Sequence, residues 1–301
     1  MNEVRQHSRQ LVREWDCVKG VYLGSGYTVS QCHVLFELAA QKSLTLMELA
    51  EILLGDKSNI SRTIKQLSDM GLVKSKKKST DNRNKFFSLT AQGKKALEET
   101  VGLADVQVAS ALSNLSRKQR QVVVDGLMFY SNALRKSRLQ SPYRIRQIKK
   151  RDNPEIASVI RDVMTEFGAV GEGYSINDSE VDQMFNNYND KRSRYFVIEK
   201  SEGEVVGGAG IGPLAGGDSA TCELRKMFFR PEVRGVGFGK RLLLMLMDEA
   251  RKKGYTQCYL ETLDRMEQAS ALYRNNGFVL LESALGKTGH CSCDSWYLLK
   301  L

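Results

Sequence analysis

Apolar positions recur at two different spacings along the chain, and the change between them divides the sequence into two halves. In the first half they recur every three to four residues, which predicts amphipathic helices. The expected helices cover about residues 3–18, 30–41, 45–53, 55–67, 90–112 and 117–135. From Tyr143 onward, short apolar runs alternate with helical segments, which predicts strands and helices in mixed order. We therefore expect two domains, 1–138 and 143–301, joined by a short linker around Pro142.

The expected helix over 55–67 has two different faces. Ile60, Ile64 and Leu67 form an apolar stripe that would be buried. The other face presents hydrogen-bonding and basic side chains, namely Ser58, Asn59, Ser61, Arg62 and Lys65. Side chains of these types reach phosphates and base edges, so the face is typical of a recognition helix. The alternative is a plain surface helix, which this segment taken alone would favour.

The sequence that follows this helix predicts a hairpin with a basic tip. A strand beginning near Leu72 and a second strand over Lys85–Leu89 enclose a polar turn over Lys74–Arg83. The turn carries Lys76, Lys77, Lys78, Asp81 and Arg83. A helix-turn-helix followed by such a hairpin resembles the winged-helix regulators of the MarR type. Their wing pattern, Asp-x-Arg-x5-Leu-Thr-x-x-Gly, is met at Asp81, Arg83, Leu89, Thr90 and Gly93.

The MarR resemblance implies a mainly α winged helix-turn-helix domain that binds double-stranded DNA as a homodimer. In that family the aspartate–arginine pair fixes the wing, and the resemblance places Arg83 in the minor groove. It also assigns the dimer interface to the first helix and the last two helices of the half, and it implies a pseudo-palindromic operator. The charge agrees, because residues 1–140 hold 22 Lys and Arg against 13 Asp and Glu, whereas residues 141–301 hold 23 against 22. A basic excess confined to the first half indicates a polyanionic partner for that half.

A glycine-rich turn in the second half has the order of elements that binds phosphate. The expected strand over Leu224–Phe229 leads into Arg234-Gly235-Val236-Gly237-Phe238-Gly239-Lys240, and an apolar helical segment follows at once. Alternate glycines let the backbone approach a ligand, and the first N–H groups of a helix point at an anion placed there. The alternative is an ordinary strand-to-helix turn with a solvated basic face. Neither a P-loop nor a dinucleotide fingerprint fits the stretch.

This turn resembles the acetyl-CoA loop of the GNAT N-acetyltransferases, Arg/Gln-x-x-Gly-x-Gly/Ala, at Arg234, Gly237 and Gly239. A second GNAT signature, Tyr-x3-Gly-Phe, occurs at Tyr273, Gly277 and Phe278. The resemblance implies an α/β acyltransferase fold with a mixed central sheet over 143–301, and acetyl-CoA as acyl donor. The cofactor contacts it implies are Met227, Phe228, Phe229, Arg234, Gly235, Val236, Gly237, Phe238, Gly239 and Lys240. One departure is Met266, where many family members carry an asparagine that contacts the cofactor.

Acetyl transfer to an amine requires a proton acceptor and a proton donor. A substrate ammonium with a pKa of ~10.4 must lose a proton, and Glu223 at the start of the central strand is our candidate base. Tyr273 is the candidate donor to the departing thiolate, and the resemblance gives the oxyanion donor as a backbone N–H near Met227. Two alternatives remain open: Glu223 pairs with Arg225 or Lys226, and Tyr273 serves packing. The resemblance places the acceptor pocket around 173–175 and 289–296.

Composition excludes several other classes of protein. No apolar run approaches the ~18 residues of a membrane span, and arginines interrupt the N-terminal segment, so we expect neither a span nor a signal peptide. We expect a cytoplasmic protein whose six cysteines are reduced thiols. Cys291 and Cys293 follow His290, but no second Cys or His pair stands at a zinc-like spacing, and we expect no metal.

The sequence thus predicts a DNA-binding transcriptional regulator fused to an acetyl-CoA-dependent N-acetyltransferase that acts on a small amine. Two alternatives are a transcription factor whose acetyltransferase half only senses a ligand, and a protein acetyltransferase brought to DNA by its first half. Turnover of acetyl-CoA with an amine would separate the first alternative from the prediction.

Overall fold

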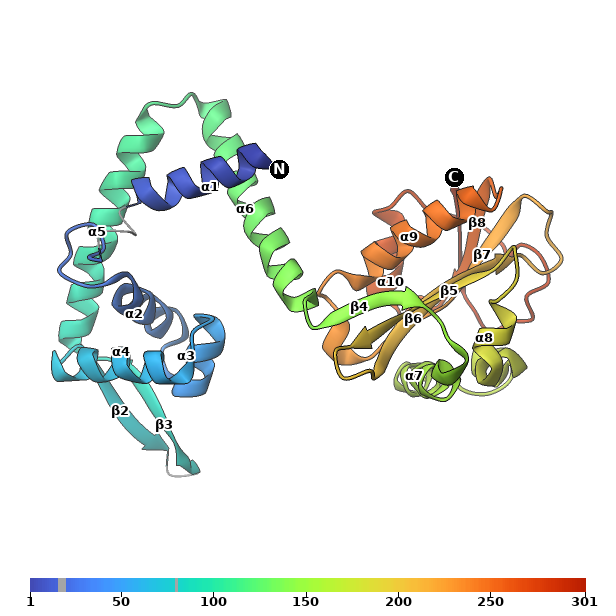
Figure 1. Cartoon of the computed structure of the whole chain (residues 1–301), viewed down its shortest axis with the longest axis horizontal. Coiled ribbons are helices and arrows are strands. Elements are labelled where there is room, and N and C mark those ends of the chain that lie inside the picture. Colours follow the sequence, from blue (N-terminus) through green and yellow to red (C-terminus); the bar gives the residue numbers. More distant parts are fainter. Residues whose placement is uncertain (16–19, 79–80) are drawn as a thin grey trace. The chain divides into compact units, whose positions relative to one another are not determined.

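The computed structural model describes residues 1–15, 20–78 and 81–301. For residues 77, 78 and 81–84 it describes the backbone only. The chain forms two compact units, Met1–Asp125 and Gly126–Leu301 (Figure 1). The long helix α6, Arg117–Gln140, runs through the boundary between them. The domain bounds expected from the sequence, 1–138 and 143–301, lie on either side of the end of this helix and stay predictions.

The first unit is mainly helical and contains one small antiparallel sheet with strand order β1-β3-β2. Its elements are α1 (Asn2–Glu14), α2 (Val29–Gln41), β1 (Leu44–Thr45), α3 (Leu46–Ile52), α4 (Lys57–Asp69), β2 (Val73–Lys78), β3 (Asp81–Leu89) and α5 (Ala91–Ser113). The core forms where the apolar stripe of α4, with Ile60, Ile64 and Leu67, packs with residues of α2 and β2. Asp56 begins α4 by accepting a hydrogen bond from the Asn59 N–H at 2.9 Å.

One expected element of this unit is described only in part, and another differs in the structure. The first helix is described as ending at Glu14, and residues 16–18, to which the expected helix extended, lie outside the described residues. The basic segment expected as a turn is largely strand, because β2 continues to Lys78 and β3 already begins at Asp81. The backbone pairing of these strands runs from Val73 opposite Leu89 outward, with a register shift after Lys77. Backbone pairing between β2 and β3 therefore extends further into the polar segment 74–83 than its turn-like composition indicates.

The second unit is built on a seven-stranded sheet with strand order β4-β5-β6-β7-β8-β10-β9. Its strands are β4 (Tyr143–Gln147), β5 (Arg194–Lys200), β6 (Val205–Pro213), β7 (Thr221–Phe229), β8 (Gln257–Thr262), β9 (Val279–Leu280) and β10 (Ser295–Lys300). Neighbouring strands are antiparallel except for β7 and β8, which are parallel. The expected mixed sheet is confirmed.

Helices cover both faces of this sheet. They are α7 (Asn153–Glu166), α8 (Met184–Asn187), α9 (Phe238–Lys252) and α10 (Glu267–Arg274), together with short 3-10 turns. Successive residues of a strand point to opposite faces. On β5, Val197 packs in the cluster that contains α7, whereas Ile198 packs in the cluster that contains α9, so these two helices lie on opposite faces (Figure 1).

Two further elements of this unit are shorter than expected. The strand expected over 278–282 is only Val279–Leu280, and the helix expected near 179–187 is a 3-10 turn, Ser179–Gln183, followed by α8. Throughout the described ranges, no helix combines the length and apolar character that crossing a bilayer requires. The cysteines in these ranges, Cys32, Cys222, Cys258, Cys291 and Cys293, are unpaired.

Candidate active site

The two parallel strands at the centre of the sheet separate along their length. Pairing between β7 and β8 runs from Thr221 opposite Gln257 to Glu223 opposite Tyr259, although both strands continue beyond that point. A cavity lies beyond the last paired residues, and both strands, α10 and the loop before β10 line it. The site is therefore an opening made by strand separation.

A bulge in β7 lies at this opening. Gly208 of β6 pairs with Phe228 and Gly210 pairs with Arg225, so Lys226 and Met227 together face one residue of β6. Lys226 takes a positive φ of 50°, which is uncommon for a residue with a side chain. Tyr195 Oη donates to the Lys226 carbonyl at 2.8 Å. Because a trans peptide directs its N–H opposite to its C=O, the Met227 N–H points away from Tyr195.

Glu223 is a buried carboxylate on the wall of the cavity. Its side chain is 6% exposed, and Arg225 Nε donates to Glu223 Oε2 at 2.7 Å. Within the described part of the chain, Glu223 Oε1 has no hydrogen-bond partner. Burial raises the pKa of Glu223, and the nearby Arg225 opposes this rise. Of the two partners weighed for Glu223, Arg225 makes the ion pair, whereas Lys226 binds Asp178 and Glu180.

Tyr273 lines the same cavity from α10. Its hydroxyl lies 3.7 Å from Met227 Sδ, and its ring packs against Phe278 and Tyr297 with centroid distances of 5.8 and 6.1 Å. Burial raises the pKa of Tyr273 well above its usual value, so the phenol keeps its proton at neutral pH. The residue thus packs and also presents a proton donor at the cavity.

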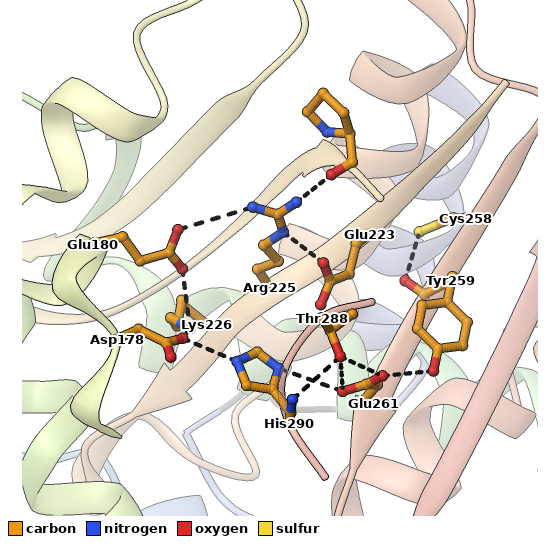
Figure 2. A network of polar contacts seen from close by, with 11 residues as sticks. Asp178, Glu180, Glu223, Arg225, Lys226, Cys258, Tyr259, Glu261, Thr288 and His290 are labelled. Atoms are coloured by element: carbon orange, nitrogen blue, oxygen red, sulfur yellow. Dashed lines mark hydrogen bonds and ion pairs between the residues drawn. The ribbon is translucent and has the colours of Figure 1, made fainter. Parts of the chain in front are cut away.

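A polar network links the cavity to two loops (Figure 2). His290 Nε2 lies 3.0 Å from Asp178 Oδ2, and His290 Nδ1 lies 3.4 Å from Glu261 Oε2. These two hydrogen-bonded carboxylates raise the pKa of His290 to about 9, so it is an imidazolium at neutral pH. Glu261 also accepts hydrogen bonds from Tyr259 Oη at 2.7 Å and from Thr288 Oγ1 at 2.9 Å. Sequence reasoning assigned the region 289–296 to the acceptor pocket but did not identify these partners.

The same residues include a possible metal-binding set. Potential ligand atoms of Glu223, Glu261 and His290 lie within 4.8 Å of one another. Both ring nitrogens of His290 face carboxylates, however, and an imidazolium has no lone pair to give to a metal ion. The geometry therefore favours a charged histidine held between two carboxylates over a metal ligand.

The glycine-rich loop joins β7 to α9. Gly235 and Gly237 have φ values of 72° and 97°, in the region that favours glycine. Gly237 is the N-cap of α9 and supplies no side-chain cap, so the first N–H groups of this helix have no such partner. Gln140 Nε2, at the end of α6, donates to the Val236 carbonyl at 2.9 Å and supports the loop from outside.

The residues expected to contact the cofactor lie in different environments. Met227 and Phe228 line the cavity, whereas the Phe238 side chain is fully buried in the core and leaves only its backbone at the loop. The Arg234 guanidinium makes two hydrogen bonds of 2.6 Å to Glu166, and its Nε donates to the Phe229 carbonyl at 2.8 Å. Its charge is thus already paired. Lys240 is exposed at the start of α9.

The residues expected to contact DNA lie on α4 and on the wing formed by β2 and β3. Each of the expected contacts on α4 is exposed: Ser58, Asn59, Ser61, Arg62 and Lys65. Ser58 Oγ donates to Asp56 Oδ1 at 2.6 Å, so this side chain also supports the helix cap. On the wing, Lys76 is exposed, and the side chains of Lys77, Lys78, Asp81 and Arg83 lie outside the described residues.

Comparison with known proteins identifies relatives of both halves. The model of the acetyltransferase (GNAT) family matches residues 156–278, and the model of the MarR family matches residues 27–85. The uncharacterized N-acetyltransferase YjgM of Escherichia coli (strain K12) is 45% identical over 163 residues, which cover 54% of this chain and 96% of that protein.

Two further likenesses are weaker. The uncharacterized HTH-type transcriptional regulator YdgJ of Bacillus subtilis is 26% identical over 103 residues, which cover 34% of this chain and 63% of that protein. A solved structure, the PaiA N-acetyltransferase of Thermoplasma acidophilum in complex with coenzyme A, is 18% identical with a TM-score of 0.43. The likeness covers 53% of this chain and 99% of that chain.

Proposed function

We propose a function for each half of the chain. The premise is that the chain belongs to the GNAT acetyltransferase family and that the MarR family model matches a segment ahead of the acetyltransferase domain. The second half transfers an acetyl group from acetyl-CoA to a small amine, and the first half binds DNA as a transcriptional regulator. The observation that carries the proposal is the opening between β7 and β8, where Glu223 and Tyr273 line one cavity.

Acetyl-CoA supplies the acetyl thioester in this proposal. The loop from Arg234 to Lys240 holds its pyrophosphate, because uncapped N–H groups at the start of α9 are donors for an anion. Arg234 acts by fixing the loop, through Glu166 and the Phe229 carbonyl, more than by offering a free charge. Lys240 is exposed and available to a phosphate.

Glu223 acts as the base. Its Oε1 has no hydrogen-bond partner within the described part of the chain, and Glu223 lines the cavity where the amine would bind. A buried carboxylate with a raised pKa is a better proton acceptor than an exposed one. The amine nitrogen forms a C–N bond to the acetyl carbon, the C–S bond breaks, and the proton of the amine passes to Glu223.

Two groups stabilise the negative charge that develops on the thioester oxygen and on the departing sulfur. The Met227 N–H, directed away from Tyr195 by the bulge, donates to the thioester oxygen as that oxygen becomes negative. Tyr273 Oη, which is protonated at neutral pH, donates a hydrogen bond and then its proton to the departing thiolate. Its present neighbour, Met227 Sδ at 3.7 Å, is a weak acceptor that a thiolate would replace.

The first half supplies the DNA-binding surface. The exposed side chains of α4 enter the major groove, and the wing with Lys76 contacts the backbone and the adjacent minor groove. In this proposal Arg83 is the residue that enters the minor groove, as in the MarR family.

We also propose a homodimer. The helices α1 and α6 contain no buried residue, although each carries large apolar side chains, as α5 also does. Those exposed by more than half of their surface include Val106 on α5 and Val122, Val124, Phe129 and Leu134 on α6. Apolar side chains in such number are typical of a surface that a second copy covers.

Incubation of the full chain with acetyl-CoA and a panel of amines and peptides, with detection of free CoA, tests the enzymatic half. Amine-dependent release of CoA is expected. If acetyl-CoA bound and no member of the panel released CoA, the second half would be a ligand sensor instead. Release with peptides but not with small amines would favour a protein acetyltransferase.

A further inference from the structure

The charged groups around the cavity are unequal in number. Four carboxylates, Asp178, Glu180, Glu223 and Glu261, meet three cations, Arg225, Lys226 and His290 (Figure 2). Of these residues, Glu223, Arg225, Lys226, Glu261 and His290 line the cavity itself. These lining residues are two carboxylates and three cations, and with Asp178 and Glu180 included and every group ionised, the network carries one negative charge in excess.

Each cation of the network already faces carboxylates of the same network. Lys226 Nζ lies 3.0 Å from Glu180 and also contacts Asp178, while its side chain is only 2% exposed. His290 is held between Asp178 and Glu261. These two cations therefore have no spare charge to offer to a ligand.

Arg225 is engaged in the same way. Its Nε donates to Glu223, its Nη2 donates to the Pro213 carbonyl, and its Nη1 lies 3.9 Å from Glu180. Arg265 does not line the cavity, and its Nη2 donates to the Gly168 carbonyl at 3.2 Å. Glu223 Oε1 adds a free acceptor to the cavity, on a side chain that is more than nine-tenths buried.

We propose that the acceptor substrate is a primary amine with an apolar body and no carboxylate on the carbon that bears the nitrogen. This inference rests on the proposed acetyltransferase activity and names its substrate class. An ammonium compensates the excess negative charge and gives Glu223 Oε1 a donor. The remaining lining offers apolar side chains to the rest of the molecule, among them Met164, Phe228, Leu263 and Met266.

The same arrangement rejects α-amino acids. In an amino acid the carboxylate stands two bonds from the nitrogen, so bringing that nitrogen to Glu223 places a further negative charge near Glu223 and Glu261, whose neighbouring cations are already paired. Like charges this close in a partly desolvated site repel strongly. The expected discrimination is on the order of 100-fold in kcat/KM in favour of the carboxylate-free amine.

Matched substrates test the inference with the full chain and acetyl-CoA. The sets are 2-phenylethylamine, phenylalanine and phenylalanine methyl ester, and 3-methylbutylamine, leucine and leucine methyl ester. The esters keep the bulk of the amino acid and remove its charge. We expect release of CoA with the amines and the esters and a kcat/KM on the order of 100-fold lower with the acids. Equal or faster turnover of the acids would overturn the inference.

A variant tests whether charge causes the discrimination. Glu261→Gln removes one carboxylate of the network, keeps its shape and leaves Glu223 in place, so the preference for amine over acid should fall by about tenfold. An unchanged preference in a folded variant would contradict the charge argument. If calorimetry showed that acetyl-CoA binds but none of the six compounds released CoA, the substrate class would be wrong. If acetyl-CoA did not bind, the proposed function itself would fail.

Discussion

Arg225 Nε donates to Glu223 Oε2 across 2.7 Å, two residues along the same strand. Because alternate residues of a strand share a face, both side chains lie on the same side of β7, where it separates from β8. The guanidinium occupies one oxygen of the carboxylate and leaves the other to the cavity. It also limits how far burial raises the pKa of Glu223. A carboxylate held in this way can accept a proton without becoming permanently neutral.

The proposed role of Tyr273 predicts a loss of rate without a loss of binding. Tyr273→Phe removes the proton donor and keeps the ring packing, so kcat should fall by roughly 10²-fold. The dissociation constant of acetyl-CoA, measured by calorimetry, should change little. Tyr297→Phe is a matched control, because this buried tyrosine contacts the Tyr273 ring and its hydroxyl lies 3.1 Å from Arg274 Nη1. Equal effects of the two substitutions would mean that Tyr273 only packs.

The loop assignment predicts that Gly237→Glu abolishes acetyl-CoA binding. A carboxylate would lie where the pyrophosphate approaches the start of α9, and like charges repel there. Gly203→Glu controls for backbone strain, because Gly203 has a φ of 98° in a turn with open space around it. Binding is expected to be lost in the first variant and kept in the second. DNA affinity should be unaffected in both, and unchanged acetyl-CoA binding in Gly237→Glu would contradict the assignment.

The raised pKa of His290 predicts that the free energy of unfolding depends on pH. Its pKa of about 9 in the folded protein lies above the 6.5 of a free histidine, because Asp178 and Glu261 hold the imidazolium. A raised pKa contributes stability that is fully present below pH ~6.5 and is lost as the pH rises through ~9. The loss should be about 1–2 kcal/mol once partial exposure is allowed for.

Calorimetric unfolding of the full chain at pH 6.5 and pH 9 measures this contribution. His290→Gln should reduce the difference in the free energy of unfolding between pH 6.5 and pH 9. His33→Gln, which replaces an exposed histidine of the other unit, should leave this difference unchanged. A pH dependence that is the same in His290→Gln and the parent chain would show that the bridge to Asp178 and Glu261 does not hold the charge.

The proposed binding of DNA by the first half predicts that the affinity falls steeply with salt concentration. Binding to a pseudo-palindromic site, with half-sites about 10 base pairs apart, should show a log–log slope of about −0.9 per neutralised phosphate. Arg83→Ala should lower affinity for the specific site and reduce the slope by about one unit per protomer. Lys150→Ala, which removes an exposed cation of the second unit, is the control and should change neither quantity. Binding without salt dependence would refute this half of the account.

Local sequence patterns were sufficient to predict the elements whose structure is determined by residues close together in the chain. The apolar stripe of α4, the β7–loop–α9 order and the α10 signature with Tyr273 each depend on residues close in sequence. Both family assignments follow from such patterns and are confirmed by the family models.

Long-range contacts were not predictable in this way. His290 and Asp178 are 112 residues apart in sequence, and nothing local to either residue indicates that they meet. The point where β7 and β8 separate is set by the pairing of Glu223 with Tyr259, which no periodicity encodes. The positive φ of Lys226 likewise follows from the bulge in β7, because a lysine gives no signal for that conformation. These features are the ones that give the cavity its charge and shape.

The central claim is that Glu223 takes the proton of the acceptor amine, and the pH dependence of kcat/KM in Glu223→Gln tests it most directly. Glu199→Gln is the matched control, because Glu199, on β5 and outside the cavity, is also a buried carboxylate and is held by arginines of β4. The account predicts a loss of ~10²–10⁴-fold for Glu223→Gln, largest near neutral pH, where Glu223 is ionised in the parent chain and the amine still carries its extra proton. Full activity in this variant, with the pH profile of the parent chain, would contradict the account.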